Sequence, residues 1–325
     1  MIALFTVGTQ AAYAGATVPK VLVSIAPLKP AVDAVLSGIT HSDVLARPGQ
    51  DAHSMVLSPS QAKALASAEI IILPSRDMSN IVTELAKRYE KKGTVIIALD
   101  ALKGAKPLPY ETHQPWLHAH EEDDGDDEQA DSHEAEQWEL NDPHMWLDPL
   151  RMAAIATPLA EAIAAHAPSL RGQLLANAQA WSTHVREELH PQIQHMLAAP
   201  AARKRYNSRP YIPFVTSHSA FQYFLTRYGI DNPGAMMLLP EDVLGARSNH
   251  TLLAQANKVT IGCVIAEQET AMVKRVATAS GATIVILNPE LLPAHDVGAG
   301  IDGLRDGYDR LLYQTAETFQ RCLEK

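Results

Sequence analysis

The first half of the chain alternates short, continuous apolar runs with stretches whose apolar residues recur every three or four positions. Each run is apolar on both faces, which is typical of a strand in a parallel sheet that helices cover on both sides. The intervening spacing predicts helices. Ser58, Pro59 and Gln61 form a helix-start signal for a helix over 62–68. The predicted strands lie at residues 20–26, 43–46, 69–73 and 94–99.

The second half repeats this style of alternation. Apolar runs again predict strands, and the amphipathic stretches between them predict helices. The strands are expected at residues 211–216, 261–266 and 283–287. The helices are expected at residues 218–228, 249–257, 271–280 and 308–322.

Between the halves, apolar residues recur with helical spacing over residues 169–197, interrupted only by Pro191. A helix of that length would extend about 40 Å. The predicted fold is therefore α/β, with two lobes that each hold a mostly parallel sheet covered by helices, joined by one long linking helix. The expected parts are residues 1–18 (a signal-peptide remnant), 19–167 (N-terminal lobe), 168–198 (linking helix) and 199–325 (C-terminal lobe).

Composition and charge narrow the functional class. A chain of 325 residues with 46% hydrophobic and 20% charged residues fits a globular protein of two domains. The formal net charge of -10 argues against nucleic acid as a partner. Much of that charge lies in residues 121–136, which hold ten acidic residues and no Lys or Arg. We expect a monomer.

The N-terminal segment 2–14 is apolar and ends in Ala-Tyr-Ala, which resembles a secretory signal and its cleavage site. No basic residue precedes Lys20, so either the true start lies further upstream or the apolar terminus is fortuitous. The segment is shorter than the ~20 residues that span a bilayer, and no other apolar run is long enough. These features predict an exported chain without a membrane span.

Cys263 and Cys322 are the two cysteines of the chain. In an exported protein an even pair is most simply a disulfide, whereas in the cytosol two buried thiols would be expected.

Three histidines occupy positions suited to a shared site. His53 and His218 follow predicted strands, and ligands of α/β sheets bind at the carboxyl ends of strands. His144 lies in the segment 141–149 (NDPHMWLDP), directly after the acidic, histidine-bearing tract 111–137. Neutral imidazoles suit zinc better than magnesium or calcium. The three residues together predict a zinc site.

Four segments carry a resemblance to a known family. They contain His53, His144, His218 and Glu267, and lie at residues 48–60, 144–149, 214–224 and 263–267. In order, spacing and flanking residues, the chain resembles the periplasmic zinc-uptake binding proteins of ABC transporters, which have a rigid linking helix.

The resemblance implies a periplasmic protein that captures Zn²⁺ between its lobes and delivers it to an ABC permease. It implies His53, His144 and His218 as metal ligands and a disulfide between Cys263 and Cys322. The tract 111–137 matches the accessory metal-binding loop of the zinc members. The histidines of that loop are His113, His118, His120 and His133.

The chain departs from the family pattern at some positions. Ala52 stands where zinc members often carry a Glu that can ligate. His218 and Asn288 stand where manganese and iron members carry carboxylates, so three imidazoles without an obvious carboxylate favour zinc. Glu267 and His295 are candidates for an outer partner or a fourth ligand, which the sequence otherwise leaves open.

Two other functions compete with zinc uptake. One is manganese or iron uptake by a protein of the same class. The other is a zinc hydrolase, because three histidines with an open position for water also hold catalytic zinc. The chain has no His-Glu-x-x-His motif that would supply a general base, so we expect no enzymatic activity.

Overall fold

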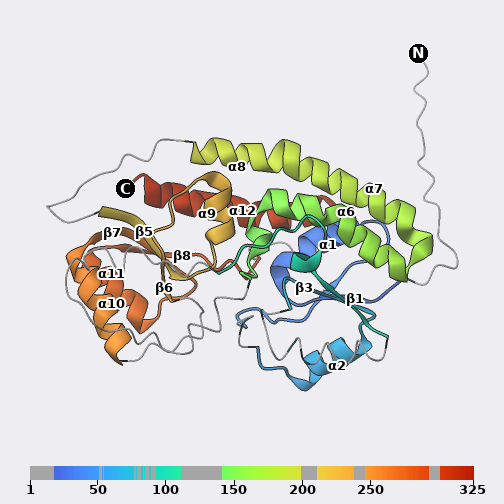
Figure 1. Ribbon diagram of the computed structural model, residues 1–325, viewed down its shortest axis with the longest axis horizontal. Coiled ribbons are helices and arrows are strands. Elements are labelled where there is room, and N and C mark those ends of the chain that lie inside the picture. Colours follow the sequence, from blue (N-terminus) through green and yellow to red (C-terminus); the bar gives the residue numbers. More distant parts are fainter. Residues whose placement is uncertain are drawn as a thin grey trace, which may run out of the picture.

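The computed structural model describes most of the chain as two lobes lying side by side, with a long helix running along both (Figure 1). The described residues are 18–50, 53, 55–76, 78, 82, 84, 88, 93–110, 141–198, 211–237, 246–292 and 301–325. Among these residues, none of the helices has the length and apolar character needed to cross a bilayer. The expected signal remnant 1–18 and the tract 111–137 lie outside them, apart from Val18.

The N-terminal lobe is built on a four-stranded parallel sheet in the order β2-β1-β3-β4. Each predicted apolar run of this half contains one of its strands, so the prediction of a parallel sheet is confirmed. The β1 and β3 strands are buried along their whole length, as expected for central strands covered on both faces. The strands are β1 (Val21–Val23), β2 (Asp43–Val44), β3 (Ile70–Leu73) and β4 (Val95–Ala98).

The helices of this lobe begin where the local sequence predicts. The α2 helix (Pro59–Ser67) starts with a capping box, in which Ser58 accepts from the backbone N–H of Gln61 and the Gln61 side chain accepts from Ser58. The spacing of apolar residues over 81–91 also predicts a helix, and only residues 82, 84 and 88 of that stretch are described. The other helices are α1 (Lys29–Val35), α6 (Pro149–His166) and the short 3-10 turns η1 (Ala26–Leu28), η2 (Leu99–Ala101) and η3 (Met145–Leu147).

The C-terminal lobe has the same topology, with a parallel sheet in the order β6-β5-β7-β8. Its strands are β5 (Tyr211–His218), β6 (Ala235–Met237), β7 (Thr260–Ala266) and β8 (Thr283–Ile286). Its helices are α9 (Gln222–Tyr228), α10 (Ala246–Lys258), α11 (Ala271–Ser280) and α12 (Ile301–Leu323).

Two details of this lobe differ from the sequence prediction. The edge strand β6 was not predicted, because three residues after Pro233 and Gly234 are too short to show a period. His218 was expected to open a helix, but it is the last residue of β5, and the helix begins at Gln222.

A disulfide joins Cys263 of β7 to Cys322 of α12, with the two Cα atoms 5.6 Å apart. The predicted disulfide is therefore present. The rings of Phe214 and Phe319 pack beside it in a T-shaped arrangement. The link fastens the last helix onto the central strands of the C-terminal sheet.

The linking helix is continuous but not uniform. It runs through η4 (Pro168–Leu170), α7 (Arg171–His184), a π-helical segment (Val185–Leu189) and α8 (His190–Leu197). Pro191 has no N–H to donate to the carbonyl four residues earlier, and the π segment directly before it accommodates that lost bond. The predicted long linking helix is confirmed, with a change of pitch near its middle.

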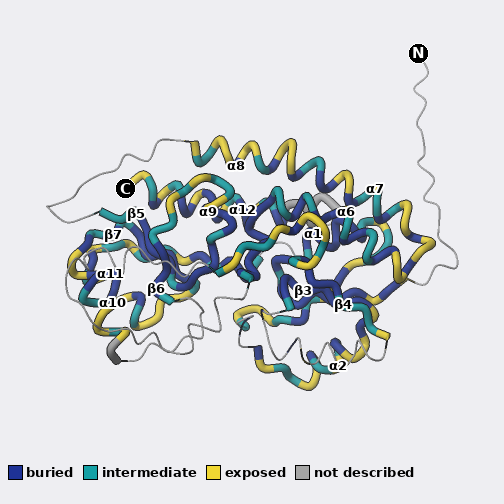
Figure 2. The backbone as a smooth tube through the Cα atoms, viewed as in Figure 1, coloured by how far each residue is buried: buried dark blue, intermediate teal, exposed yellow. Residues whose placement is uncertain are grey.

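The interior is continuous from one lobe to the other. A single core cluster includes Val23 and Ile72 of the N-terminal sheet, Trp181 of the linking helix, and Phe214 and Cys263 of the C-terminal sheet. Figure 2 shows the buried strands at the centre of each lobe and exposed faces on the outer helices. The two lobes and the linking helix therefore share one core cluster.

Candidate metal centre

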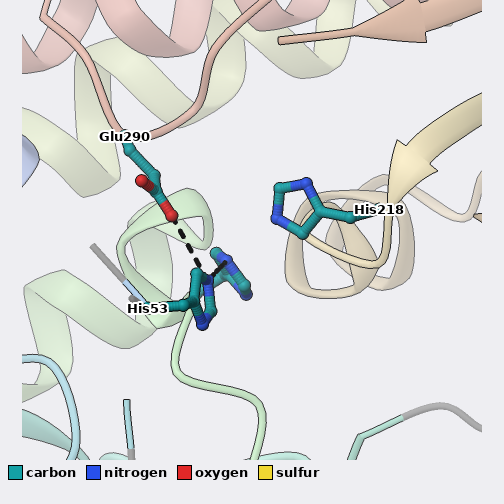
Figure 3. A group of neighbouring side chains, drawn as sticks. His53, His218 and Glu290 are labelled. Carbon is teal, nitrogen blue, oxygen red and sulfur yellow. Dashed lines mark hydrogen bonds and ion pairs between the residues drawn. The ribbon is translucent and has the colours of Figure 1, made fainter. Parts of the chain in front are cut away.

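Four buried side chains from both lobes converge between the sheets. One ligand atom each of His53, His144, His218 and Glu290 lies within 4.8 Å of the others. Figure 3 shows His53 and Glu290 on one side of the group and His218 facing them from the other. Because all four side chains are buried, their polar atoms have little access to water.

His218 comes from the centre of the C-terminal sheet, as the last residue of β5. Its Nδ1 lies 3.0 Å from Oε1 of Glu267, the residue that follows the neighbouring strand β7. This carboxylate fixes the ring with Nε2 available to a ligand. The Nε2 atom is fully buried and has no hydrogen-bond partner among the described residues. A buried ring nitrogen without a partner is costly unless it binds something, and a metal ion satisfies it.

His144 is oriented by the residue two positions before it. Oδ1 of Asp142 accepts a hydrogen bond of 2.9 Å from the His144 backbone N–H and lies 2.7 Å from Nδ1 of the ring. The Nε2 atom therefore faces the other ligands. Both residues are fully buried.

Burial also sets the protonation of this pair. Burial first, and then the charges of His53 and His218, lower the pKa of His144 well below its usual range. The imidazole is therefore neutral, which is the form that binds metal. Burial raises the pKa of Asp142 to about 7, although its bond with the His144 backbone opposes the rise.

His53 comes from the loop that follows the edge strand β2. Its Nε2 lies 3.3 Å from Nε2 of His144 and 3.2 Å from Oε1 of Glu290. The rings of the three histidines are mutually close, with centroids 5.2 to 5.9 Å apart. The short distance between the Nε2 atoms of His53 and His144 is what two ligands of one shared cation require.

Glu290 is the ligand candidate that the sequence prediction missed. It lies on the loop after β8, where Asn288 turns the chain by accepting from the Glu290 backbone N–H at 2.8 Å. The carbonyl of Pro289 accepts from the Trp146 indole at 3.0 Å, which fixes the loop against the His144 segment. The sequence left the fourth ligand open, and the structure places Glu290, which was not among the candidates, beside the three imidazoles. The sequence did hold one signal for Glu290, because an acidic residue soon after a predicted parallel strand can reach a site at the carboxyl end of the sheet.

The other predicted site residues separate into two groups. Glu267 is placed on the outer side of His218 and is absent from the four-residue group. His295 lies outside the described residues, and so do the four histidines of the loop, His113, His118, His120 and His133. The described part of the chain holds one group of metal-ligating side chains of this kind.

Three imidazoles and one carboxylate, each with one ligand atom within 4.8 Å of the others, could together hold a divalent cation. This donor set suits tetrahedral zinc. Both lobes contribute, so a bound ion would join them.

Comparisons with known proteins identify the family of the chain. The family model described as "Zinc-uptake complex component A periplasmic" matches residues 21–322. The high-affinity zinc uptake system protein ZnuA of Brucella suis is 27% identical over 325 residues, which cover 94% of this chain and 92% of that protein. The protein of the same name from Yersinia pestis is 25% identical over 312 residues, which cover 94% and 91%.

Solved structures show the same fold. A crystal structure of ZnuA superposes with a TM-score of 0.69 at 21% identity, covering 94% of this chain and 99% of that one. The Zn(II)-bound AdcA of Streptococcus pneumoniae gives a TM-score of 0.67 at 18% identity, covering 95% of this chain and 58% of that one. With a family model that matches nearly the whole chain, this protein belongs to the periplasmic zinc-uptake component A family.

Proposed function

We propose that this chain is an exported, non-enzymatic protein that captures Zn²⁺ between its lobes and delivers it to an ABC permease. His53, His144, His218 and Glu290 are the proposed ligands. The observation that carries the proposal is the convergence of these four buried side chains, with the Nε2 of His218 lacking any partner among the described residues.

Zinc is preferred over manganese or iron as the cargo. Because Glu290 adds a carboxylate, the donor set by itself fits both zinc and harder divalent ions. The family decides between them, since its description and the names of the Brucella and Yersinia relatives specify zinc uptake. Zinc should therefore outcompete manganese when both are offered to the metal-free protein.

Glu290 also argues against a zinc hydrolase. A catalytic zinc keeps one position for water, whereas Glu290 supplies a fourth protein ligand. The zinc-loaded protein should not turn over model esters or peptides.

The ligand assignment is tested by replacing each histidine with alanine and measuring zinc affinity in a chelator competition. His53→Ala, His144→Ala and His218→Ala should each weaken binding. His250→Ala is the matched control, because His250 is exposed on α10 and does not belong to the group of metal-ligating side chains found among the described residues. Unchanged affinity in all three site variants would overturn the proposal.

The tract 111–137 is proposed to be accessory. Deleting it should leave one tight zinc site, because all four proposed ligands lie outside it. Loss of the tight site would instead make the tract the primary binder, with ligands such as His113, His118, His120 and His133.

Export and domain division form part of the same proposal. Residues 1–18 are assigned to the signal remnant, 19–167 and 199–325 to the lobes, and 168–198 to the linking helix. N-terminal sequencing of the protein recovered from the periplasm should give a start between residues 15 and 19, after the Ala-Tyr-Ala sequence. A mature chain that retains the apolar segment would contradict it.

A further inference from the structure

The helix α9 follows the proposed ligand His218 in the chain and contacts the η3 turn that follows His144. It begins four residues after His218 and ends at Gly229, whose positive φ of 64° closes the helix. Tyr223 and Arg227 are four residues apart on this helix, so their side chains lie on the same face. Both reach the segment 142–148, which carries His144.

Tyr223 holds the beginning of that segment. Its hydroxyl donates a hydrogen bond of 3.0 Å to the carbonyl of Asp142 and accepts one of 2.9 Å from the N–H of Leu108. The side chain is buried, and burial raises the pKa of Tyr223 above its usual value, so the hydroxyl remains a donor. Asp142 is the residue whose carboxylate orients the His144 ring.

Arg227 holds the end of the segment. Its Nε and Nη2 donate to the two carboxylate oxygens of Asp148 at 2.7 and 2.8 Å. Asp148 is almost completely buried and also caps α6 through the N–H groups of Leu150 and Arg151. A bidentate guanidinium–carboxylate pair fixes both distance and orientation.

These two contacts attach a segment of the N-terminal lobe to a helix of the C-terminal lobe. The geometry points to Tyr223 and Arg227, here called the α9 pair, as positioning residues that hold His144 at zinc-binding distance from His218. This inference rests on the proposed function. Zinc–nitrogen bonds require about 2.0–2.1 Å, so a small increase in the freedom of His144 should weaken the site.

The experiment measures how fast zinc leaves the full-length protein when a chelator is added in excess. The variants are Tyr223→Phe, which removes both hydrogen bonds but keeps the ring, and Arg227→Gln, which removes the bidentate pair. Arg227→Lys keeps the positive charge but cannot form the two parallel hydrogen bonds of a guanidinium group. Each variant is also loaded with Co²⁺, whose visible absorption reports the coordination geometry directly.

Two matched controls make the same kinds of substitution at another tyrosine and another arginine. Tyr228→Phe alters the neighbouring hydroxyl on α9, which lies 3.3 Å from Nδ1 of His190 on the linking helix. Arg171→Gln removes another guanidinium–carboxylate pair, formed with Glu161 on the surface. Thermal unfolding of the metal-free proteins measures any general loss of stability.

Tyr223→Phe and Arg227→Gln should each release zinc about 10-fold faster and change the Co²⁺ spectrum, with Arg227→Lys intermediate and the controls like wild type. If the pair variants lose only thermal stability and keep the wild-type release rate and spectrum, the positioning role is refuted. If wild type itself binds no zinc tightly, the proposed function fails instead. Arg227→Lys retains the charge beside Asp148 and keeps the test decisive if Arg227→Gln does not fold.

Discussion

The two lobes share one sheet topology but supply their ligands in different ways. In the C-terminal lobe, His218 is the last residue of the inner strand β5. In the N-terminal lobe, the corresponding inner strand β1 ends without a ligand, and His53 instead follows the two-residue edge strand β2 through a loop. The same fold thus holds one imidazole on a strand and another on a loop.

This difference has an energetic consequence. A ligand at the end of a buried inner strand is already ordered before metal arrives, whereas a loop ligand must lose conformational entropy on binding. The C-terminal lobe also supplies Glu290 and is fastened by the Cys263–Cys322 disulfide. We therefore expect it to act as the preformed half of the site.

The largest predicted effect is loss of His218. Structural zinc sites bind with about 10–16 kcal/mol, so one of four ligands contributes about 3–4 kcal/mol, or roughly 100- to 1,000-fold in affinity. His218→Ala should weaken zinc binding by that amount, and His53→Ala by less, because His53 follows a two-residue edge strand whereas His218 ends a buried inner strand. Isothermal titration at fixed pH would compare them. A larger loss for His53→Ala would reverse the proposed asymmetry.

The disulfide should stabilise the C-terminal lobe more than it affects the site. The double variant Cys263→Ser, Cys322→Ser should lower the free energy of unfolding by about 2–4 kcal/mol, because it releases a constraint on the unfolded chain. Urea unfolding followed by fluorescence measures this, and zinc affinity of the folded variant should stay near wild type. An unchanged unfolding midpoint would show that the link adds no stability.

Removing either of the two carboxylates that orient an imidazole should weaken zinc binding less than removing a ligand, and by a similar amount for each carboxylate. Asp142→Asn and Glu267→Gln each weaken the support of one ring, and the expected loss of zinc affinity is about 10-fold. Glu269→Gln is the matched control, because Glu269 is half exposed and pairs with Lys274. Equal affinity of the Glu267 and Glu269 variants would mean that His218 needs no outer partner.

The pH dependence should be modest and should trace to Asp142. Its pKa is raised to about 7, so below pH 7 the metal-free protein carries a proton there. Zinc on His144 adds positive charge nearby and favours the carboxylate, so binding releases this proton. His144 is already neutral and releases none.

Affinity should therefore rise from pH 6 to about 7, by at most about 10-fold per unit for a single proton. Asp142→Asn should flatten this rise, which titrations in buffers of different ionisation enthalpy would detect. An identical pH profile in the variant would assign the released proton to another group.

Much of the fold could be predicted because its strands are apolar throughout and its helices carry clear start signals, as at Ser58. The features that the sequence did not predict are the β6 strand and the π segment of the linking helix. The β6 strand is defined by pairing with β5 and has no pattern of its own. The π segment before Pro191 accommodates the lost backbone hydrogen bond by a local change of pitch, which the apolar periodicity does not encode.

The site was less predictable than the fold. His53 and His218 could be proposed because they follow strands, and His144 because of its motif. Glu290 was harder to single out, because its position depends on the Asn288 turn and on the Trp146 contact with Pro289. The second of these contacts joins residues 143 positions apart in the sequence.

The most direct test of the account is a crystal structure of the zinc-loaded protein with anomalous diffraction at the zinc edge. We expect one strong peak about 2.0–2.2 Å from ligand atoms of His53, His144, His218 and Glu290. A zinc ion bound tightly elsewhere, with these four side chains left uncoordinated, would contradict it.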